Sequence, residues 1–318
     1  MVVAYIERFA MKLACLVFIL ALGLPAYGQT LRRDNGELRS WVSFRPANPG
    51  ANALPVLFVL HGGGGSAKQI RKHFSFDVLA KKNRFMVIYP DGLEKHWNDA
   101  RQGGTVKLFT GKKPDDVGFL RQLAALLVAN GEADADRIYV TGVSNGGMMV
   151  QRLLCEASET FAAGASLIAN LPAALADCAP AKPRSILLIN GDADPLMPQN
   201  GGGVGFRQKR GFVLSTMKSF DHWAAVNQCA ATPTSNQLPN QNQTDGTTAA
   251  KFVADDCLPA HKVQLISIAG GGHTVPTLRA PSKRLKARLR TRILGATNRD
   301  FEAKQMIWDF LQDARAAN

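Results

Sequence analysis

The stretch Tyr139–Leu154, YVTGVSNGGMMVQRLL, joins a β-rich run to a helical run through a glycine-rich turn. Gly142, Ser144 and Gly146 match the pattern G-x-S-x-G, which can hold a serine on a sharp strand-to-helix turn. The glycines relieve crowding there, and the start of the helix directs amide N–H groups toward an anion that forms beside Ser144. So short a pattern also occurs in structural bends, so the rest of the chain decides whether Ser144 is a nucleophile.

A nucleophilic serine needs a histidine base, which in turn needs a carboxylate to orient it. With this turn on a parallel sheet, the chain order is serine, acid, histidine, each following a strand. His273 fits, because it follows the strand-like run VQLISI through three glycines. The other five histidines have the wrong order or setting: His61, His73, His96, His222 and His261. We therefore predict Ser144 and His273 as nucleophile and base.

Two aspartates are candidates for the acid, since both follow the strand-like run SILLIN in the loop NGDADPLMP. Asp194 is favoured over Asp192, because a residue two positions further out on the loop reaches the imidazole more easily. Asp192 would then brace the turn.

Two backbone N–H groups are expected to stabilise the oxyanion of a tetrahedral intermediate. The first is that of Asn145, directly after the nucleophile. The second comes from Gly63 or Gly64 in LHGGGGSA, where four glycines allow the backbone to approach closely. A phosphate-binding loop is the rival interpretation, but the pattern G-x-x-x-x-G-K-[ST] is absent. His61 is expected to anchor this loop.

The alternation of short apolar runs with helical patterns predicts an α/β fold: one domain with a mostly parallel sheet and helices on both faces. KPDDVGFLRQLAALLVANG predicts a helix that starts near Pro114 and stops at Gly131, and 301–316 predicts a terminal helix capped by Asn298 or Asp300. Polar or glycine-rich composition predicts loops at 200–211 and 232–248. The predicted strands are Leu38–Phe44, Val56–Leu60, Phe85–Tyr89, Ile138–Thr141, Ser185–Asn190 and Val263–Ile268.

The N-terminal residues 1–28 predict a signal peptide, with Met11 as a candidate true start. A lysine, an apolar run and the small-x-small triplet Ala26–Gly28 form the pattern. The apolar run of about 12 residues is too short to span a bilayer. We therefore expect an exported catalytic domain at 29–318, secreted or periplasmic, without stable membrane insertion.

Four cysteines remain after the predicted cleavage, and four cysteines allow three pairings. In an oxidising compartment they predict two disulfides. Sequence neighbours close the shortest loops, which favours Cys155–Cys178 and Cys229–Cys257. None lies in a CxxC pattern, so no metal site is predicted.

The formal charge of +13 is concentrated near the C-terminus. Eight basic and no acidic residues lie from 279 to 299: Arg279, Lys283, Arg284, Lys286, Arg288, Arg290, Arg292 and Arg299. No aromatic residue there could stack on a base, so a nucleic-acid partner is not predicted. A solvated basic loop or short helix is one interpretation; contact with an anionic surface or polymer is the other.

Several motifs occur together in a fixed order: LHGGGGSA, YPDGL…WND, DDVGFL, GVSNGGMM, NGDADPLMP and GGGHTVP. This set, spread over about residues 35–315, resembles the secreted polyhydroxybutyrate depolymerase/feruloyl esterase-like family of α/β-hydrolases. The resemblance implies carboxylic-ester hydrolysis through an acyl-enzyme, with Ser144, Asp194 and His273 as the triad and no cofactor. AAVNQC also resembles the family at the cysteine after its cap helix, which supports the pairing of Cys229 with Cys257.

The ester itself stays open between hydroxyalkanoate oligomers and feruloyl or acetyl esters of plant polysaccharide. The family often has H-T-W-P after the histidine, whereas Val275 stands here in place of tryptophan, which puts feruloyl specificity in doubt. Trp97 is a candidate acyl-pocket residue, with core packing as its alternative. An acyltransferase or peptidase using the same triad, or a non-catalytic binding protein, are the competing functions.

Overall fold

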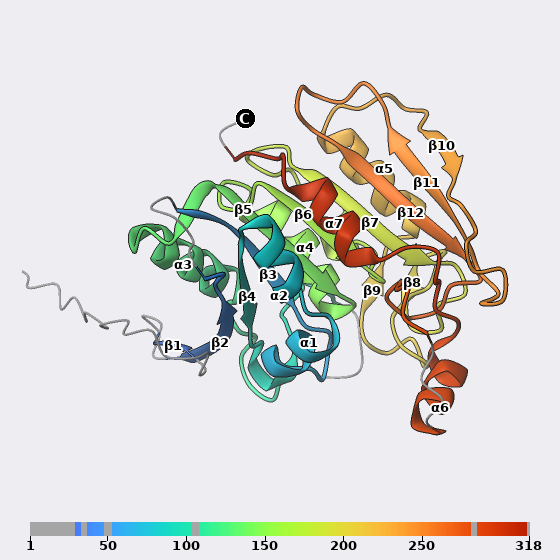
Figure 1. Cartoon of the computed structure of the whole chain (residues 1–318), viewed down its shortest axis with the longest axis horizontal. Coiled ribbons are helices and arrows are strands. Elements are labelled where there is room, and N and C mark those ends of the chain that lie inside the picture. The colour runs from blue at the N-terminus through green and yellow to red at the C-terminus, as the bar shows by residue number, and fades with distance from the viewer. Residues whose placement is uncertain (1–28, 33–36, 48–52, 103–107, 281–284, 317–318) are drawn as a thin grey trace, which may run out of the picture.

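The computed structural model describes residues 29–32, 37–47, 53–102, 108–280 and 285–316 (Figure 1). The predicted signal peptide, residues 1–28, lies outside them. A ten-stranded sheet runs through the molecule in the order β1-β2-β4-β3-β5-β6-β7-β12-β11-β10. The six strands from β4 to β12 pair in parallel, and the strands at both edges pair antiparallel. The mostly parallel sheet is confirmed.

The strands of this sheet are β1 Gln29–Arg32, β2 Leu38–Phe44, β3 Leu54–Leu60, β4 Met86–Pro90, β5 Ala133–Val143, β6 Ala163–Leu167, β7 Ser185–Gly191, β10 Thr234–Gln237, β11 Thr248–Ala254 and β12 Val263–Ala269. A separate ribbon pairs β8 Gly202–Gly203 with β9 Phe212–Val213. The helices are α1 Ala67–His73, α2 Asp77–Asn83, α3 Asp116–Ala129, α4 Asn145–Glu156, α5 Thr216–Val226, α6 Leu285–Leu294 and α7 Ala303–Leu311, with short 3₁₀ turns at Leu93–Lys95 and Ala173–Leu175.

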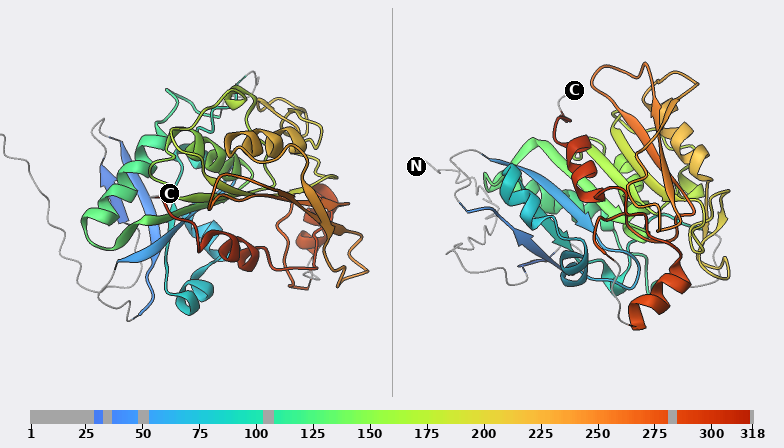
Figure 2. Two further views of the ribbon diagram at one scale, coloured as in Figure 1. Left: turned by 90° about the horizontal axis from the view of Figure 1, so that it is seen from above. Right: turned by 45° about the vertical axis from the view of Figure 1, so that its right-hand side comes forward.

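Helices cover both faces of the sheet, because its central strands are apolar on both faces. Along β3, Phe58 and Leu60 face one apolar cluster, whereas Leu57 and Val59 face another. The first cluster includes buried residues of α3, α4 and α5, and the second those of α1, α2 and α7. Figure 2 shows these two helical layers on opposite sides of the sheet. The predicted arrangement of helices is therefore confirmed.

The largest omission of the sequence prediction is β6, a buried central strand of the sequence AGASL. Alanine, glycine and serine carry no strand signal, and the strand forms because β5 and β7 flank it. The region predicted as a polar loop at 232–248 contains β10, and the predicted glycine-rich loop contains β8.

The predicted caps of the terminal helix are wrong, since Glu302 occupies the N-cap position of α7 and makes no side-chain cap. Asp300 instead accepts hydrogen bonds from Asn242 N–H and from the Asn298 amide, at 2.9 and 2.7 Å. Both residues therefore tie the segment before α7 to the loop preceding β11. No helix within the described ranges has the length and apolar character needed to cross a membrane.

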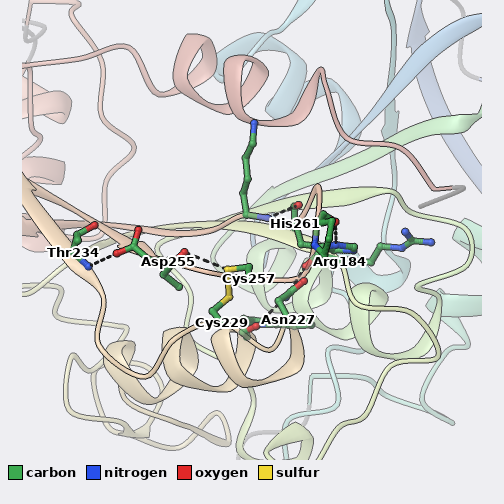
Figure 3. The surroundings of a disulfide bond; sticks show 12 residues. Arg184, Asn227, Cys229, Thr234, Asp255, Cys257 and His261 are labelled. Atoms are coloured by element: carbon green, nitrogen blue, oxygen red, sulfur yellow. Dashed lines mark hydrogen bonds between the residues drawn. A yellow bond between two sulfur atoms is a disulfide. The ribbon is translucent and has the colours of Figure 1, made fainter.

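Both favoured disulfides are formed in the structure. Cys155 lies on α4 and is joined to Cys178, while Cys229, just after α5, is joined to Cys257, just after β11. Figure 3 shows the second bond and the Asn227 amide beside it, which donates to the Arg184 carbonyl at 3.1 Å. The Cys229–Cys257 disulfide links α5 to the antiparallel edge of the sheet.

Candidate active site

Ser144 lies on a strained turn between β5 and α4. Its backbone has φ 55° and ψ −118°, a conformation that non-glycine residues rarely adopt. The turn fits only because its neighbours lack side chains: a Cβ at Gly142 would meet the Gly146 carbonyl, and one at Gly146 would meet the His61 carbonyl, both under 3.0 Å. The sequence pattern thus corresponds to a sharp strand-to-helix turn that holds a half-buried serine.

The three predicted triad residues are brought together by loops at the carboxyl ends of β5, β7 and β12. The His273 Nε2 atom lies 3.0 Å from the Ser144 Oγ atom, and the His273 Nδ1 atom lies 2.6 Å from the Asp194 Oδ2 atom. These distances and the order of the groups are those of a serine hydroxyl, a base and an orienting carboxylate. The imidazole is 9% exposed and the carboxylate 2%, so water is largely excluded from the pair.

Asp194 is held by its own loop. Its Oδ1 atom accepts hydrogen bonds from the N–H groups of Leu196 and Met197, at 2.7 and 2.8 Å. The other candidate acid, Asp192, accepts a bond from the Gly270 N–H at 2.7 Å and so links the loops after β7 and β12. The geometry separates the two aspartates: Asp194 orients the imidazole and Asp192 braces the turn.

His273 is fixed by the chain that returns from α6. Its N–H donates to the Leu294 carbonyl at 2.6 Å, and the Gly272 N–H donates to the Ala296 carbonyl at 2.9 Å. A Cβ at Gly272 would lie under 3.0 Å from backbone atoms of Leu294 and Gly295. The last residue of α6 and the residues after it therefore support the histidine loop.

The glycine-rich loop after β3 lies against the serine turn. A Cβ placed on Gly62 would lie 3.7 Å from the Ser144 Cβ, and one on Gly63 would lie 3.6 Å from the Asn145 Cβ. The Gly64 N–H, however, donates to the Lys95 carbonyl at 2.8 Å. The Gly64 N–H is therefore already bonded, which favours Gly63 as the oxyanion donor of the predicted pair.

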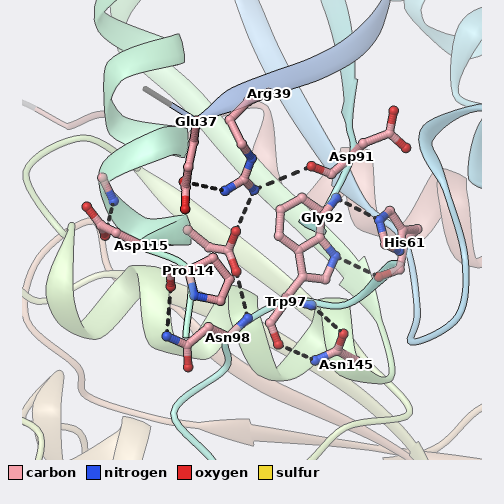
Figure 4. A network of polar contacts seen from close by, with 12 residues as sticks. Glu37, Arg39, His61, Asp91, Gly92, Trp97, Asn98, Pro114, Asp115 and Asn145 are labelled. Carbon is pink, nitrogen blue, oxygen red and sulfur yellow. Dashed lines mark hydrogen bonds and ion pairs between the residues drawn. The ribbon is translucent and has the colours of Figure 1, made fainter. Parts of the chain in front are cut away.

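Trp97 does not line a substrate pocket, because its side chain is completely buried. Its indole N–H donates to the His61 carbonyl at 2.9 Å, which fixes it beneath the glycine-rich loop (Figure 4). The Asn145 side chain bonds both backbone groups of Trp97 and also donates to Asp99. The prediction of Trp97 as a substrate-binding residue is corrected: its role is packing and positioning.

Asp99 was not among the predicted residues, although it lies two positions after Trp97. Its carboxylate is buried, accepts from the Asn145 amide at 2.6 Å and pairs with the Arg101 guanidinium at 2.9 Å. The sequence signal that could have indicated it is the acid two positions after a tryptophan in WND, but an acid in a loop is usually solvated. Its partner on the nucleophile helix could not be inferred from one sequence.

His61 anchors the glycine-rich loop, as predicted from the sequence. Its Nε2 atom accepts a hydrogen bond from the Gly92 N–H at 2.9 Å, and its Nδ1 atom lies 2.8 Å from the Gly62 carbonyl (Figure 4). Since Nε2 accepts, the ring is neutral with its proton on Nδ1. Burial lowers the pKa of the His61 imidazole, which keeps it in this form.

The basic segment 279–299 contains α6, which projects from the body of the molecule (Figures 1 and 2). Residues 281–284 lie outside the described residues. Arg279 and Arg292 are exposed, as are the side chains of Leu289 and Ile293. The short basic helix is confirmed, and contact with an anionic surface stays a prediction.

Known proteins resemble this chain at the level of sequence and fold. The family model described as the Prolyl oligopeptidase family matches residues 116–171. NocK, named as a candidate esterase, of Nocardia uniformis subsp. tsuyamanensis is 29% identical over 280 residues, which cover 83% of this chain and 77% of NocK. Feruloyl esterase B of Piromyces equi is 29% identical over 236 residues, 73% of this chain and 42% of that protein. This chain therefore spans less than half of the Piromyces relative.

A solved structure supports the same fold. The acetyl xylan esterase from Aspergillus awamori superimposes with a TM-score of 0.54 at 18% identity, covering 78% of this chain and 94% of its own. The doubly covered parallel sheet and the turn after β5 define an α/β-hydrolase. Within that class, the similarity to proteins named as esterases supports a carboxylic ester hydrolase that resembles the feruloyl esterases.

Proposed function

We propose that this carboxylic ester hydrolase works through Ser144, His273 and Asp194. The observation that carries the proposal is the continuous hydrogen-bonded chain from the Ser144 hydroxyl to the Asp194 carboxylate, at 3.0 and 2.6 Å. It lies on the strained turn at the start of α4, where a helix N-terminus faces the serine.

In the first half of the reaction, the Ser144 Oγ atom attacks the ester carbonyl while His273 Nε2 takes the hydroxyl proton. The backbone N–H groups of Asn145 and Gly63 hold the resulting oxyanion. Collapse of the tetrahedral intermediate breaks the bond to the alcohol oxygen, which leaves with the proton from His273. Asp194 keeps Nδ1 protonated and stabilises the imidazolium that forms.

In the second half, His273 takes a proton from water, and the hydroxide attacks the acyl group on Ser144. The serine leaves with the same proton and the carboxylic acid is released. The products are the carboxylic acid and the alcohol, one water molecule is consumed, and the enzyme is regenerated. No step uses Asp192, which lies in the bracing contact to Gly270.

For the substrate, we propose acyl esters carried by plant polysaccharide. The feruloyl and acetyl xylan esterases among the relatives support this class over hydroxyalkanoate oligomers. The predicted signal peptide and the two disulfides support a secreted or periplasmic location, where such polymers are met.

The test is a set of purified-protein rates on p-nitrophenyl acetate, methyl ferulate and a hydroxybutyrate oligomer. Ser144→Ala should lower kcat by about 10⁶-fold, and Asp194→Asn by about 10⁴-fold, with folded structure retained. Asp192→Asn is the matched control and should keep most of the activity. Full turnover by Ser144→Ala would refute the mechanism, and turnover of the oligomer alone would refute the polysaccharide class. Cleavage of a p-nitroanilide at a comparable rate would favour a peptidase instead.

A further inference from the structure

The tip of the β8–β9 hairpin carries a cluster of cations that the reaction above does not use. Its sequence, Phe206–Arg210, is FRQKR, in which three of five residues are basic and none is acidic. All five residues are exposed, and the Phe206 side chain is 64% exposed. Arg207, Lys209 and Arg210 form no salt bridge with any residue that the structure describes. Such a cluster attracts anions from solution.

The base of this hairpin packs against the elements that carry Ser144 and Asp194. Val204 and Val213 are buried against Met148 of the nucleophile helix and Met197 of the acid loop. The Gly205 N–H also donates to the Leu196 carbonyl at 2.8 Å, next to the N–H groups that hold Asp194.

A second set of contacts joins the hairpin to the oxyanion side of the site. The Arg101 guanidinium donates to the Arg210 carbonyl at 2.9 Å, and Arg101 is itself paired with Asp99, the partner of Asn145. The Phe212 N–H donates to the Gln102 carbonyl at 3.2 Å. The exposed tip is therefore presented at the edge of the site by residues that contact both the acid loop and the nucleophile helix.

We propose that the tip Phe206–Arg210 binds the uronate carboxylates of an acidic polysaccharide that carries the ester. This rests on the proposed esterase function. Arginine pairs with carboxylates in a bidentate manner, and a repeating anionic chain engages several cations at once. The exposed rings of Phe206 and Phe212, 64% and 46% exposed, offer apolar surfaces for the C–H faces of sugar rings. Because the base of the hairpin packs against the helix and loop that carry Ser144 and Asp194, a ligand on the tip can be continuous with the substrate, which favours a polysaccharide over a lipid surface or a nucleic acid.

The binding experiment uses the Ser144→Ala chain, so that binding is measured without turnover. Polygalacturonate is the anionic probe and unsubstituted xylan the neutral one, in affinity electrophoresis. The triple variant Arg207→Gln, Lys209→Gln, Arg210→Gln should bind polygalacturonate roughly tenfold more weakly at low ionic strength. The difference should vanish near 1 M salt, where the Debye length is about 3 Å. Binding to neutral xylan should be the same for both chains.

The matched control removes the same charge elsewhere, at the exposed lysines of α1 and α2, in the triple variant Lys72→Gln, Lys81→Gln, Lys82→Gln. It should bind polygalacturonate as the parent does. Phe206→Ala should weaken retention at both salt concentrations.

In an otherwise wild-type chain, the hairpin triple variant should hydrolyse p-nitrophenyl acetate at the parent rate but lose activity on acetylated pectin. Equal losses of binding in the hairpin and control variants would overturn the proposal, as would unchanged binding of the hairpin variant. Retention by anionic vesicles or single-stranded DNA but not by polygalacturonate would also overturn it. A wild-type chain without turnover of p-nitrophenyl acetate would refute the esterase mechanism, and the Ser144→Ala binding data would still decide the uronate site.

Discussion

Asn145 and Trp97 exchange two hydrogen bonds: the Trp97 N–H donates to Asn145 Oδ1 at 2.8 Å, and Asn145 Nδ2 donates to the Trp97 carbonyl at 2.9 Å. The same amide reaches the buried Asp99 carboxylate at 2.6 Å. Because Asn145 directly follows the nucleophile, its side chain connects the serine turn to the segment beneath the glycine-rich loop. The two sides of the proposed oxyanion hole are thereby held at a fixed separation.

Replacing Asn145 with alanine should both destabilise the protein and lower its rate of ester hydrolysis. The substitution leaves the Trp97 groups and the Asp99 carboxylate buried without their partner, which should lower the free energy of unfolding by about 2 kcal/mol or more. The kcat on p-nitrophenyl acetate should fall while KM changes less, because the oxyanion donors lose their spacing. Urea unfolding and steady-state kinetics measure the two effects. Asn236→Ala on the exposed strand β10 is the control, and equal behaviour of the two variants would contradict the positioning role.

The residues of this site differ in how well the sequence predicted them. Ser144, Asp194 and His273 could be predicted because each follows a strand, and parallel strands end at one edge of the sheet. The sequence left two choices open, between substrate binding and packing for Trp97 and between Gly63 and Gly64 as oxyanion donor. A single sequence does not show which indole is buried or which amide is already bonded. Asp99 was missed for the same reason, since its partner lies 46 residues away.

The strands of the sheet also differ in how well the sequence predicted them. The central strands β3 and β7 are runs of large apolar residues and were predicted within two residues of their bounds. β6 was missed because its alanine, glycine and serine side chains leave room for α4: a Cβ on Gly164 would meet Val150 and Leu154 of that helix. Its small side chains are explained by the packing of α4, which local patterns do not reveal.

Acid should destabilise the protein partly through His61. Burial lowers the pKa of this imidazole in the folded chain. The Nε2 atom also cannot carry a proton while it accepts the hydrogen bond from the Gly92 N–H. The unfolded chain therefore binds more protons below about pH 6.5, so stability is complete above that pH and falls as the pH is lowered. The slope from this group approaches about 1.4 kcal/mol per pH unit.

His61→Gln should reduce that slope, because glutamine does not titrate. The measurement is the free energy of unfolding in urea between pH 5 and pH 7 for both chains. Burial also lowers the pKa of His222, which therefore contributes to the remaining slope. His222→Gln should reduce the slope in the same way. Parallel pH profiles for the parent and His61→Gln would show that His61 is not the titrating group.

Removing the Cys229–Cys257 disulfide should cost stability without abolishing activity. The bond closes a segment with a sequence separation of 28 and ties α5 to β11, so its loss should lower the free energy of unfolding by about 3 kcal/mol. Cys229→Ala, Cys257→Ala should melt earlier, yet hydrolyse p-nitrophenyl acetate normally at low temperature. Differential scanning calorimetry with and without reductant is the measurement. A reduced parent that melts like the oxidised one would contradict the expectation.

Gly272→Ala should displace His273, the proposed catalytic base, by moving the loop that carries it. Its new Cβ would lie under 3.0 Å from backbone atoms of Leu294 and Gly295, so the histidine loop and the chain leaving α6 must move apart. The His273 N–H would then lose its bond to the Leu294 carbonyl, now 2.6 Å long. A displacement of about 1 Å at the imidazole lowers kcat by roughly 100-fold.

The control is Gly111→Ala, since no atom lies within 4 Å of a Cβ placed there. The rate of Ser144 labelling by a fluorophosphonate separates the cause from general unfolding, because it depends on the histidine base. Gly272→Ala should stay folded by circular dichroism, label slowly and turn over slowly, whereas Gly111→Ala should match the parent in all three. Normal labelling by a folded Gly272→Ala chain would mean that the α6 return segment does not position His273.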